Sequence, residues 1–318
     1  MFPSLMRVMS RSRVTVLLFH KVPLQKDALA PGESDFQAFE QVLDFLCDHY
    51  RILPLPDVLA GLDSGKLPSG GVCITFDDGY ADWMEGAIPA LERRNAHATL
   101  FLTTGQLAEN GMPMWHERIR HAVQAAVSPL RDCSSSHALP VATLAEKRAA
   151  VALLDREFKY LPLAEREARL LSLEQQAACH ASDMPRLGAA QVRAIANRGF
   201  TIGAHTENHP ILTMSSLDEV RYEFGAARET LQSITGQPVN CLAYPNGRQQ
   251  DFNQSHVELA RAAGYTSAVT TVPGTLDLQT SRFHIPRFTP WGPDPLRMWL
   301  QMSRNLVRGA SAFSRGSV

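Results

Sequence analysis

This sequence has few cysteines, and its positive and negative charges nearly cancel. The five cysteines are scattered and never form a C-x-x-C pair, so the sequence encodes neither a disulfide framework nor a thiolate zinc site. The 31 lysines and arginines against 32 aspartates and glutamates leave a formal net charge of -1. Such a balance supplies no general field to attract a polyanion, so we expect no nucleic-acid partner.

Long hydrophobic runs are absent as well. The longest near the start, residues 14–19, is far shorter than the ~20 residues that span a bilayer. Arginines precede this run, as in a signal peptide. However, the run is shorter than the ~7–15 residues of a signal core, and no small-residue cleavage site follows. We therefore predict no transmembrane span, no signal peptide and a cytoplasmic location.

Short apolar runs alternate with helical patterns along the chain, which indicates βα units and a parallel sheet. The runs are Val14–Phe19, Val72–Phe76, Ala98–Leu102, Thr201–Ala204, Cys241–Tyr244, Ser267–Thr270 and Phe283–Pro286. Several are apolar throughout, as expected when helices cover both faces of a strand. About seven strands favour a barrel, although periodicity does not separate a barrel from an open sheet.

Two covering helices are indicated by their apolar faces and end residues. Ser34 is the expected N-cap of a helix whose apolar face runs over 36–46. A second helix is expected over 217–234, with Gly236 just beyond it as a stop signal. Both helices are expected to pack on the sheet.

Two further segments depart from the βα pattern. Over 113–184 strand signals vanish and Ala, Glu, Arg and Leu dominate, which predicts an all-helical insertion within a single domain of residues 1–318. Near the end, an amphipathic helix from Pro295 to about Val307 carries both leucines and arginines. It either packs on the barrel or makes a peripheral contact with an anionic membrane surface.

Polar side chains follow the apolar runs, where ligands bind in parallel α/β folds. Asp77 and Asp78 follow one run, and His205 and His209 follow another. An Asp-Asp-Gly sequence alone more often marks a turn, and a lone H-x-x-x-H pair arises by chance. Pro210 favours a compact loop for the histidines. One Asp and two His are suited to a metal that activates water, and a second carboxylate can accept the proton.

Thr75–Tyr80 and His205–His209 resemble the first two motifs of the polysaccharide deacetylases with a NodB homology domain, carbohydrate esterase family four. The resemblance is strongest to the biofilm and exopolysaccharide branch. It implies a distorted (β/α)7 barrel, with Asp77 as general base and Asp78, His205 and His209 as metal ligands. It further implies a divalent metal, zinc first and cobalt, nickel or iron as alternatives, and an N-acetylated saccharide as partner.

The third family motif is similar to Ala243–Gly247, with two departures. Alanine replaces the arginine that steadies the base in relatives, and Asn246 replaces an aromatic residue. The Asn246 backbone N–H can still serve an oxyanion, because this donor does not depend on the side chain. Arg287 and Arg248 are the candidates for the missing arginine, and anchoring of a loop is the alternative role for each.

The general acid is predicted at the start of the chain. Leu18-Phe19-His20 resembles the family's Leu-x-His motif, which the biofilm branch carries at this place by circular permutation. We therefore assign His20 as the general acid, with capping of a strand end as the alternative. His284 is a rival, although strict alternation turns its side chain away from the pocket.

Four residues are expected to contact the saccharide. Tyr80, Tyr244 and Pro245 belong to the motifs, and Trp291 follows the last run, where its ring can stack on a sugar. The other tryptophans are candidates for stacking or for burial in the core, and these are Trp83, Trp115 and Trp299.

These residues together predict a metal-dependent hydrolase that removes N-acetyl groups from hexosamine units and releases acetate. The main alternative is a sugar- or metal-binding domain of the same fold that has lost turnover, which the missing arginine permits. A two-His-one-carboxylate iron oxygenase is disfavoured, since such sites place His and Asp two residues apart on an antiparallel scaffold. A cytoplasmic location would make lipid- or nucleotide-linked saccharides the available substrates.

Overall fold

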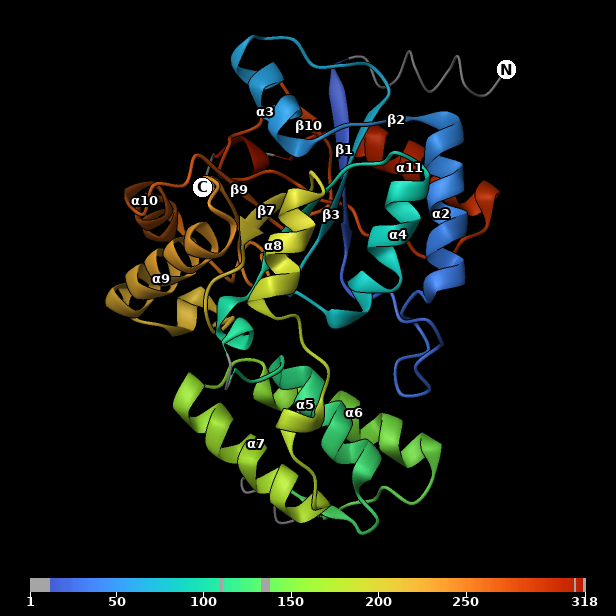
Figure 1. Cartoon of the computed structure of the whole chain (residues 1–318), viewed down its shortest axis with the longest axis vertical. Coiled ribbons are helices and arrows are strands. Elements are labelled where there is room, and N and C mark those ends of the chain that lie inside the picture. Colours follow the sequence, from blue (N-terminus) through green and yellow to red (C-terminus); the bar gives the residue numbers. More distant parts are fainter. Residues whose placement is uncertain (1–11, 109–110, 133–137, 312, 317–318) are drawn as a thin grey trace.

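A curled, mostly parallel sheet forms the centre of the computed structural model, which describes residues 12–108, 111–132, 138–311 and 313–316 (Figure 1). The sheet order is β10-β1-β3-β4-β7-β8-β9, with β2 paired to β3. The strands are β1 (Arg13–Phe19), β2 (Arg51–Ile52), β3 (Gly71–Phe76), β4 (Ala98–Leu102), β7 (Thr201–Ala204), β8 (Cys241–Ala243), β9 (Ser267–Val269) and β10 (Leu276–Asp277). All neighbours pair in parallel except β10, which is antiparallel to β1.

The seventh apolar run links the two ends of this sheet without forming a regular strand. Ile285 makes a parallel bridge to Val269 of β9, and Phe288 makes one to Leu17 of β1. Pro286 lies between the two bridges and has no N–H to donate, so a continuous ladder is not formed there. The parallel strands β1, β3, β4, β7, β8 and β9, with β2 beside β3, and this bridging segment give the predicted distorted (β/α)7 barrel, which is confirmed.

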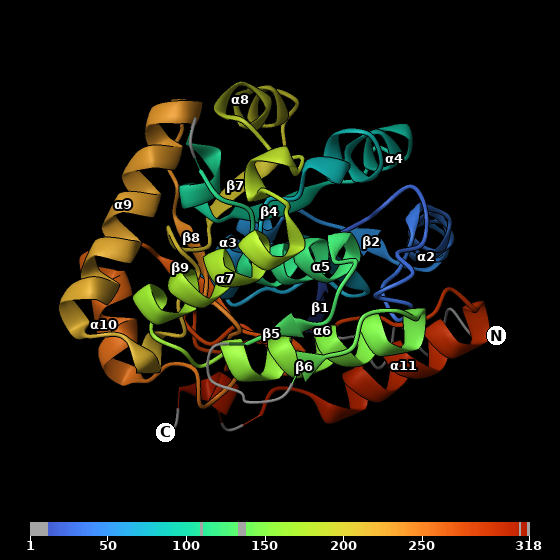
Figure 2. The same ribbon diagram turned by 90° about the horizontal axis from the view of Figure 1, so that it is seen from below.

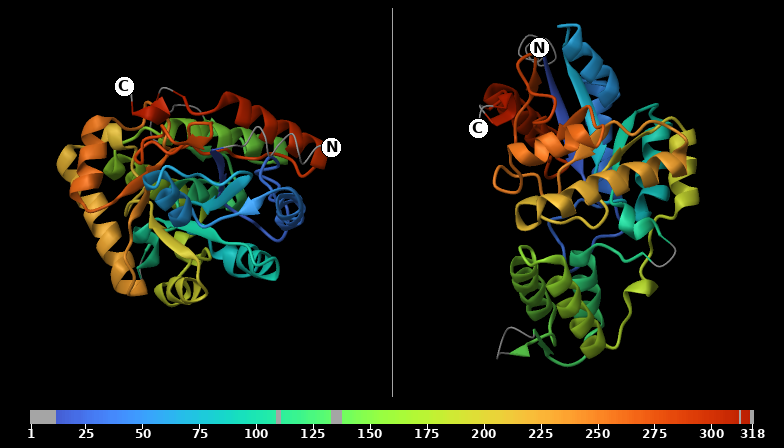
Figure 3. Two further views of the ribbon diagram at one scale, coloured as in Figure 1. Left: turned by 90° about the horizontal axis from the view of Figure 1, so that it is seen from above. Right: turned by 90° about the vertical axis from the view of Figure 1, so that its left-hand side faces the viewer.

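Helices surround the sheet, as the view from above shows (Figure 3). They are α2 (Phe36–His49), α3 (Leu55–Asp63), α4 (Ala87–Arg93), α8 (Ala189–Asn197), α9 (Leu217–Thr235), α10 (Gln254–Ala262) and α11 (Pro295–Arg308). The cap of α2 differs from the prediction: Asp35, not Ser34, accepts the N–H of Ala38 at 2.8 Å. Gly236 ends α9 in the left-handed conformation, as predicted.

The insertion lies below the barrel and covers one end of it (Figure 2). It contains α5 (Trp115–Ala125), α6 (Leu144–Phe158) and α7 (Leu163–Ala177). These helices bury their own apolar cluster, which includes Ile119, Leu154 and Leu170. The prediction of an all-helical insertion is wrong in one respect, because an antiparallel pair of β5 (Leu130–Arg131) and β6 (Ala138–Leu139) accompanies the helices. Leu130 and Leu139 are buried in the same cluster, so the pair forms because it closes that core.

Short 3-10 turns follow three of the strands, and these are η1 (Ala81–Met84), η2 (Thr104–Leu107) and η4 (Leu212–Met214). Two others, η3 (Ala181–Asp183) and η5 (Phe313–Arg315), follow helices. Cys73 and Cys241 are buried in the apolar filling of the barrel, as predicted for small core residues. Among the helices that the structure describes, none is both long and apolar enough to cross a membrane.

Candidate active site

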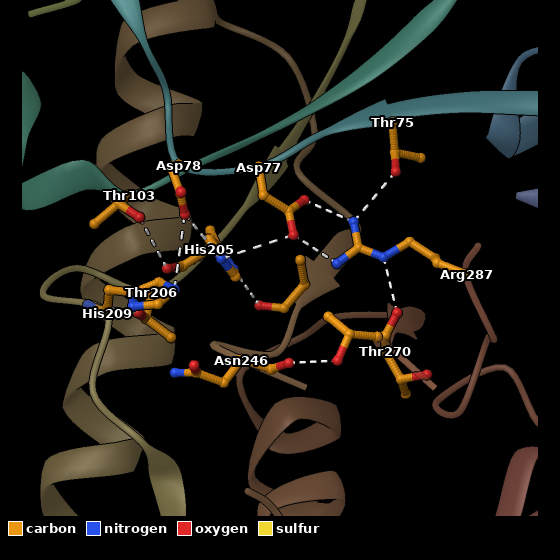
Figure 4. Close-up of polar contacts among 12 residues, drawn as sticks. Thr75, Asp77, Asp78, Thr103, His205, Thr206, His209, Asn246, Thr270 and Arg287 are labelled. Atoms are coloured by element: carbon orange, nitrogen blue, oxygen red, sulfur yellow. Dashed lines mark hydrogen bonds and ion pairs between the residues drawn. The ribbon is translucent and has the colours of Figure 1, made fainter. Parts of the chain in front are cut away.

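Two adjacent carboxylates stand at the carboxyl end of β3. All six residues of β3 are buried, so the strand fixes the position at which Asp77 begins. The Asp77 N–H donates to the Phe19 carbonyl at 3.0 Å. Asp78 then turns into the left-handed region with φ 82°, and Gly79 follows with φ 91°. A left-handed aspartate is strained. This turn directs Asp77 toward Arg287 and Asp78 toward the two histidines, while His205 Nε2 also lies 3.9 Å from Asp77 Oδ2 (Figure 4).

Arg287 holds Asp77 from the other end of the chain. Its Nη1 and Nη2 donate to the two carboxylate oxygens of Asp77 at 2.6 Å each. The guanidinium is fixed in turn, since Nε donates to the Thr270 carbonyl at 2.8 Å and Nη1 reaches Thr75 Oγ1 at 3.2 Å. Arg287 and Asp77 are 1% and 2% exposed. Of the two arginines considered from the sequence, the structure brings Arg287 to Asp77.

Arg248 has a different environment. Its side chain is exposed, and its backbone N–H donates to the carboxylate of Asp251 at 3.0 Å. Arg248 lines the cavity near Asn246, and in the part of the chain that the structure describes it makes no hydrogen bond or ion pair with Asp77. The arginine that contacts Asp77 is therefore Arg287, which is distant in sequence, and not Arg248, which lies nearest the third motif.

Asp78, His205 and His209 form one buried donor cluster. His205 Nε2 lies 3.4 Å from Asp78 Oδ1, and His209 Nε2 lies 3.7 Å from the same oxygen. Three ligand atoms, one from each residue, lie within 4.8 Å of one another. His205 uses its Nδ1 against the Ala243 carbonyl at 2.8 Å, which leaves Nε2 free for a cation. Two imidazoles and one carboxylate form a typical catalytic zinc donor set, so these residues fit a divalent metal.

Burial and neighbouring charges act differently on the two imidazoles. Burial and the adjacent His205 hold the pKa of His209 well below its usual value, which favours the neutral, metal-binding form. Burial also lowers the pKa of His205, but Asp77 and Asp78 outweigh it and raise that pKa overall. Within the described part of the chain, His209 Nδ1 is a buried nitrogen with no hydrogen-bond partner.

The histidine loop is compact, as expected, but His209 is left-handed and not in the extended conformation that the following proline favours. Thr206 and His209 are both left-handed, with φ 65° and 52°, and the His209 N–H donates to Thr206 Oγ1 at 3.0 Å. Glu223 of α9 accepts the N–H groups of Glu207 and Asn208 at 2.8 Å each. The sequence analysis did not identify Glu223. The feature that could have identified it is an acidic residue on the same buried side of α9 as Val220 and Phe224.

The third motif reaches the cavity through Asn246 alone. Asn246 is left-handed with φ 57°, and its carbonyl accepts the Thr271 hydroxyl at 2.5 Å. Tyr244 is fully buried and stacks on Phe252 with ring centroids 4.0 Å apart. Neither Tyr244 nor Pro245 lines the cavity. The expected saccharide contact by these two residues is therefore not supported, because Tyr244 follows β8 into the core.

One cavity of about 560 Å³ brings most of the predicted residues together. Its lining includes His20, Asp77, Asp78, Tyr80, His205, His209, Asn246, Arg248 and Trp291. His284 lies elsewhere and packs its ring against Phe252 and Phe313. Trp83 and Trp115 are buried, Trp299 packs against the core, and Trp291 is 58% exposed.

The segment that carries His20 is anchored from η1. The His20 carbonyl accepts the Trp83 indole N–H at 2.7 Å, and the Val22 N–H donates to Asp82 Oδ2 at 3.0 Å. The His20 side chain itself is exposed. These two bonds fix the backbone on both sides of Lys21, so His20 is presented to the cavity from a braced position.

The insertion supplies part of the cavity wall that sequence reasoning did not assign. Trp115, His116 and Lys159 all line it. His116 Nε2 lies 2.7 Å from the Tyr80 hydroxyl, and Lys21 pairs with Glu117 of α5 at 2.5 Å. Nothing in the local sequence marks these residues, because their place depends on how the insertion sits on the barrel.

Comparisons with known proteins agree with this geometry. The Bacillus subtilis protein YxkH, named as a polysaccharide deacetylase, is 20% identical over 265 residues, which cover 83% of this chain and 66% of YxkH. The chain thus spans just under two thirds of that relative. The Streptococcus pyogenes deacetylase PplD, solved in complex with acetate, has TM-score 0.61 at 19% identity, covering 91% of this chain and 98% of PplD. IcaB from Ammonifex degensii has TM-score 0.60 at 16% identity, covering 92% and 97%.

The family model for polysaccharide deacetylase matches residues 64–268. This segment exceeds half of the chain and contains both aspartates, both histidines and Asn246 of the site, whereas His20 and Arg287 come from outside it. With the shared barrel fold and the gathered motifs, it follows that the chain belongs to the polysaccharide deacetylase family.

Proposed function

We propose that this protein is a metal-dependent hydrolase that removes N-acetyl groups from hexosamine units of a poly- or oligosaccharide, such as an exopolysaccharide. The observation that carries the proposal is one cavity in which an arginine-held aspartate stands beside an Asp-His-His cluster. Water adds to the acetyl carbonyl carbon, the C–N bond breaks, and acetate and a free amine leave.

Asp78, His205 and His209 would hold a divalent cation, with zinc the first choice for two imidazoles and a carboxylate, and cobalt, nickel or iron as alternatives. Bound there, such an ion polarises the acetyl carbonyl and lowers the pKa of water. Donation from His205 Nδ1 to the Ala243 carbonyl keeps Nε2 directed at the cluster.

Asp77 is the proposed general base. The Arg287 fork occupies one lone pair on each of its oxygens, and a carboxylate retains further acceptor positions. Asp77 therefore accepts the proton of the attacking water while the arginine keeps the carboxylate oriented. The Asn246 N–H is the proposed donor to the oxyanion, and His20 is the proposed acid that protonates the departing nitrogen.

Tyr80 and Trp291 are the proposed saccharide contacts, because both line the cavity and Trp291 presents an exposed ring. The alternative of a binding domain without turnover was based on the missing third-motif arginine. The contact between Arg287 and Asp77 removes that reason, so we keep hydrolysis as the proposal.

Acetate release tests this function. Chelator-stripped protein, with and without added zinc, is assayed on N-acetylhexosamine oligomers and on lipid- and nucleotide-linked acetamido sugars. Zinc-dependent release from at least one member is expected. If zinc binds stoichiometrically and no member loses acetate, the protein is a binding domain and the proposal is wrong.

A further inference from the structure

The outer face of α11 carries an apolar stripe that nothing in the described chain covers. Leu296, Leu300 and Val307 are 65%, 54% and 70% exposed. At ~100° per residue these three positions fall within about 40° of one another around the helix axis. Single exposed apolar side chains are ordinary, but these two leucines and one valine lie in line on one helix and form a patch.

The stripe is not a core face that lacks its partner, because the opposite side of α11 already packs on the barrel. Met298, Met302 and Leu306 are buried there. The helix is also tied by polar bonds, with Asn305 donating to the Gly274 carbonyl at 2.9 Å and Arg13 donating to the Leu306 carbonyl at 2.7 Å. α11 lies along the outside of the barrel (Figures 2 and 3), and it has a fixed inner face and an apolar outer face.

Arginines flank the stripe, and α11 contains no acidic residue. Arg297, Arg304 and Arg308 are all exposed. On neighbouring α2, two of the three acidic residues, Glu40 and Asp44, are paired with arginines at the end of α4. The chain as a whole has a net charge of only -1, so the positive charge of this face is a local feature.

We propose that this outer face of α11 docks the protein on an anionic lipid surface. A helix with an apolar stripe and basic flanks is typical of segments that lie in the plane of a membrane interface. The leucines and the valine enter the acyl boundary, and the arginines attract anionic headgroups.

The docking face adjoins the mouth of the cavity. Trp291, which lines that cavity, exchanges two hydrogen bonds with the Gln301 side chain of α11, at 3.0 and 2.7 Å. Arg297 also stacks over the Trp291 ring at 4.9 Å. A lipid surface under α11 therefore lies beside the cavity, where saccharides attached to lipid are presented. The docking itself does not depend on the proposed hydrolysis.

Vesicle co-sedimentation tests this inference with three variants of the full chain. One is Leu296→Ser/Leu300→Ser/Val307→Ser, the second is Arg304→Gln/Arg308→Gln, and the control is Leu217→Ser/Tyr222→Ser. The control residues are 48% and 60% exposed on α9, next to acidic Asp218 and Glu219. Circular dichroism checks that each variant folds.

Wild type and control are expected to bind phosphatidylglycerol vesicles and not pure phosphatidylcholine vesicles. The arginine variant should partition at least tenfold more weakly, and the serine variant on the order of a hundredfold more weakly. Raised salt should weaken wild-type binding. Absence of wild-type binding, or equal losses in the control, would overturn the proposal. A wild-type dimer that becomes monomeric only in the serine variant would also overturn the proposal, because this face would then be the contact between two copies of the chain.

Discussion

Asp77 and Arg287 form the contact on which the chemistry of the cavity depends most. They lie 210 positions apart and are joined by two hydrogen bonds of 2.6 Å. Both groups are buried. Removal of either side chain would therefore leave the other charge buried without its partner, which destabilises the fold.

Replacing Arg287 with lysine is expected to lower kcat/KM about a hundredfold, because an ammonium cannot make both bonds and the carboxylate shifts. Zinc content should remain that of wild type, and the loss should lie in kcat. Steady-state kinetics and metal analysis measure both. Arg282→Lys is the matched control, since Arg282 also makes two hydrogen bonds to one carboxylate, through Nε and Nη2 to Asp63 at the surface. Equal losses in the two variants would show a general effect on stability.

The role of His20 can be separated from general damage by the choice of leaving group. His20→Gln is expected to lower the turnover of an N-acetylated sugar about a hundredfold or more, because an amine leaves poorly without a proton. Hydrolysis of an activated aryl acetate should change little, since that leaving group needs no proton. His284→Gln should leave the ratio of the two activities as in wild type. A His20 variant that loses both activities equally would remove the assignment.

At the level of elements, the turn η1 braces the loop that follows β1. Burial raises the pKa of Asp82 to about 6, although the Val22 N–H and Lys21 act in the opposite direction. Its folded pKa is thus above its unfolded value of 3.8. The protonated form is therefore the one that folding favours, and this contribution to stability is present below pH 3.8 and is lost as the pH rises through about 6.

Asp82→Asn is expected to remove this dependence. Relative to wild type, the free energy of unfolding of the variant should rise by ~1–2 kcal/mol between pH 4 and pH 8. Urea unfolding of both proteins at each pH measures the difference, in which the other titrating groups cancel. An unchanged difference across this range would mean that Asp82 is not buried in solution as it is in the structure.

The insertion is an element with a core of its own that also lines the cavity. Leu154 is fully buried among its helices, so Leu154→Ala is expected to cost about 2–5 kcal/mol. Hydrogen exchange should show the loss over 115–177, with strands β3 and β7 protected as before. Zinc affinity should hold while KM rises, because His116 and Lys159 are displaced and the metal ligands are not. Equal loss of protection in the barrel would contradict separate cores.

At the scale of the whole molecule, the sequence predicted the barrel because its strands are apolar on both faces. The predicted first, second, third and fourth runs match β1, β3, β4 and β7 to within a residue. The run that ends at Pro286 forms a segment with isolated bridges and not a regular strand. An apolar pattern does not reveal that the hydrogen-bond ladder is interrupted by a residue without an N–H. The cap of α2 moved by one position, as helix ends often do.

The site was predictable where its residues are adjacent in sequence and harder where they are not. Asp77, Asp78, His205 and His209 follow strand ends, so their convergence follows from the parallel sheet. The choice between Arg287 and Arg248 stayed open because no local pattern records a contact across 210 residues. Tyr244 was expected to contact the saccharide, but it does not line the cavity. The motif identifies its place in the sequence and does not reveal that its ring is buried against Phe252.

Metal content and acetate release measured in the same samples test the central claim most directly. Wild type, Asp77→Asn and His205→Ala are each loaded with zinc, dialysed and assayed. We predict about one zinc per chain with acetate release in wild type, one zinc without release in Asp77→Asn, and neither in His205→Ala. Undiminished release from Asp77→Asn, or full zinc content in His205→Ala, would contradict the account.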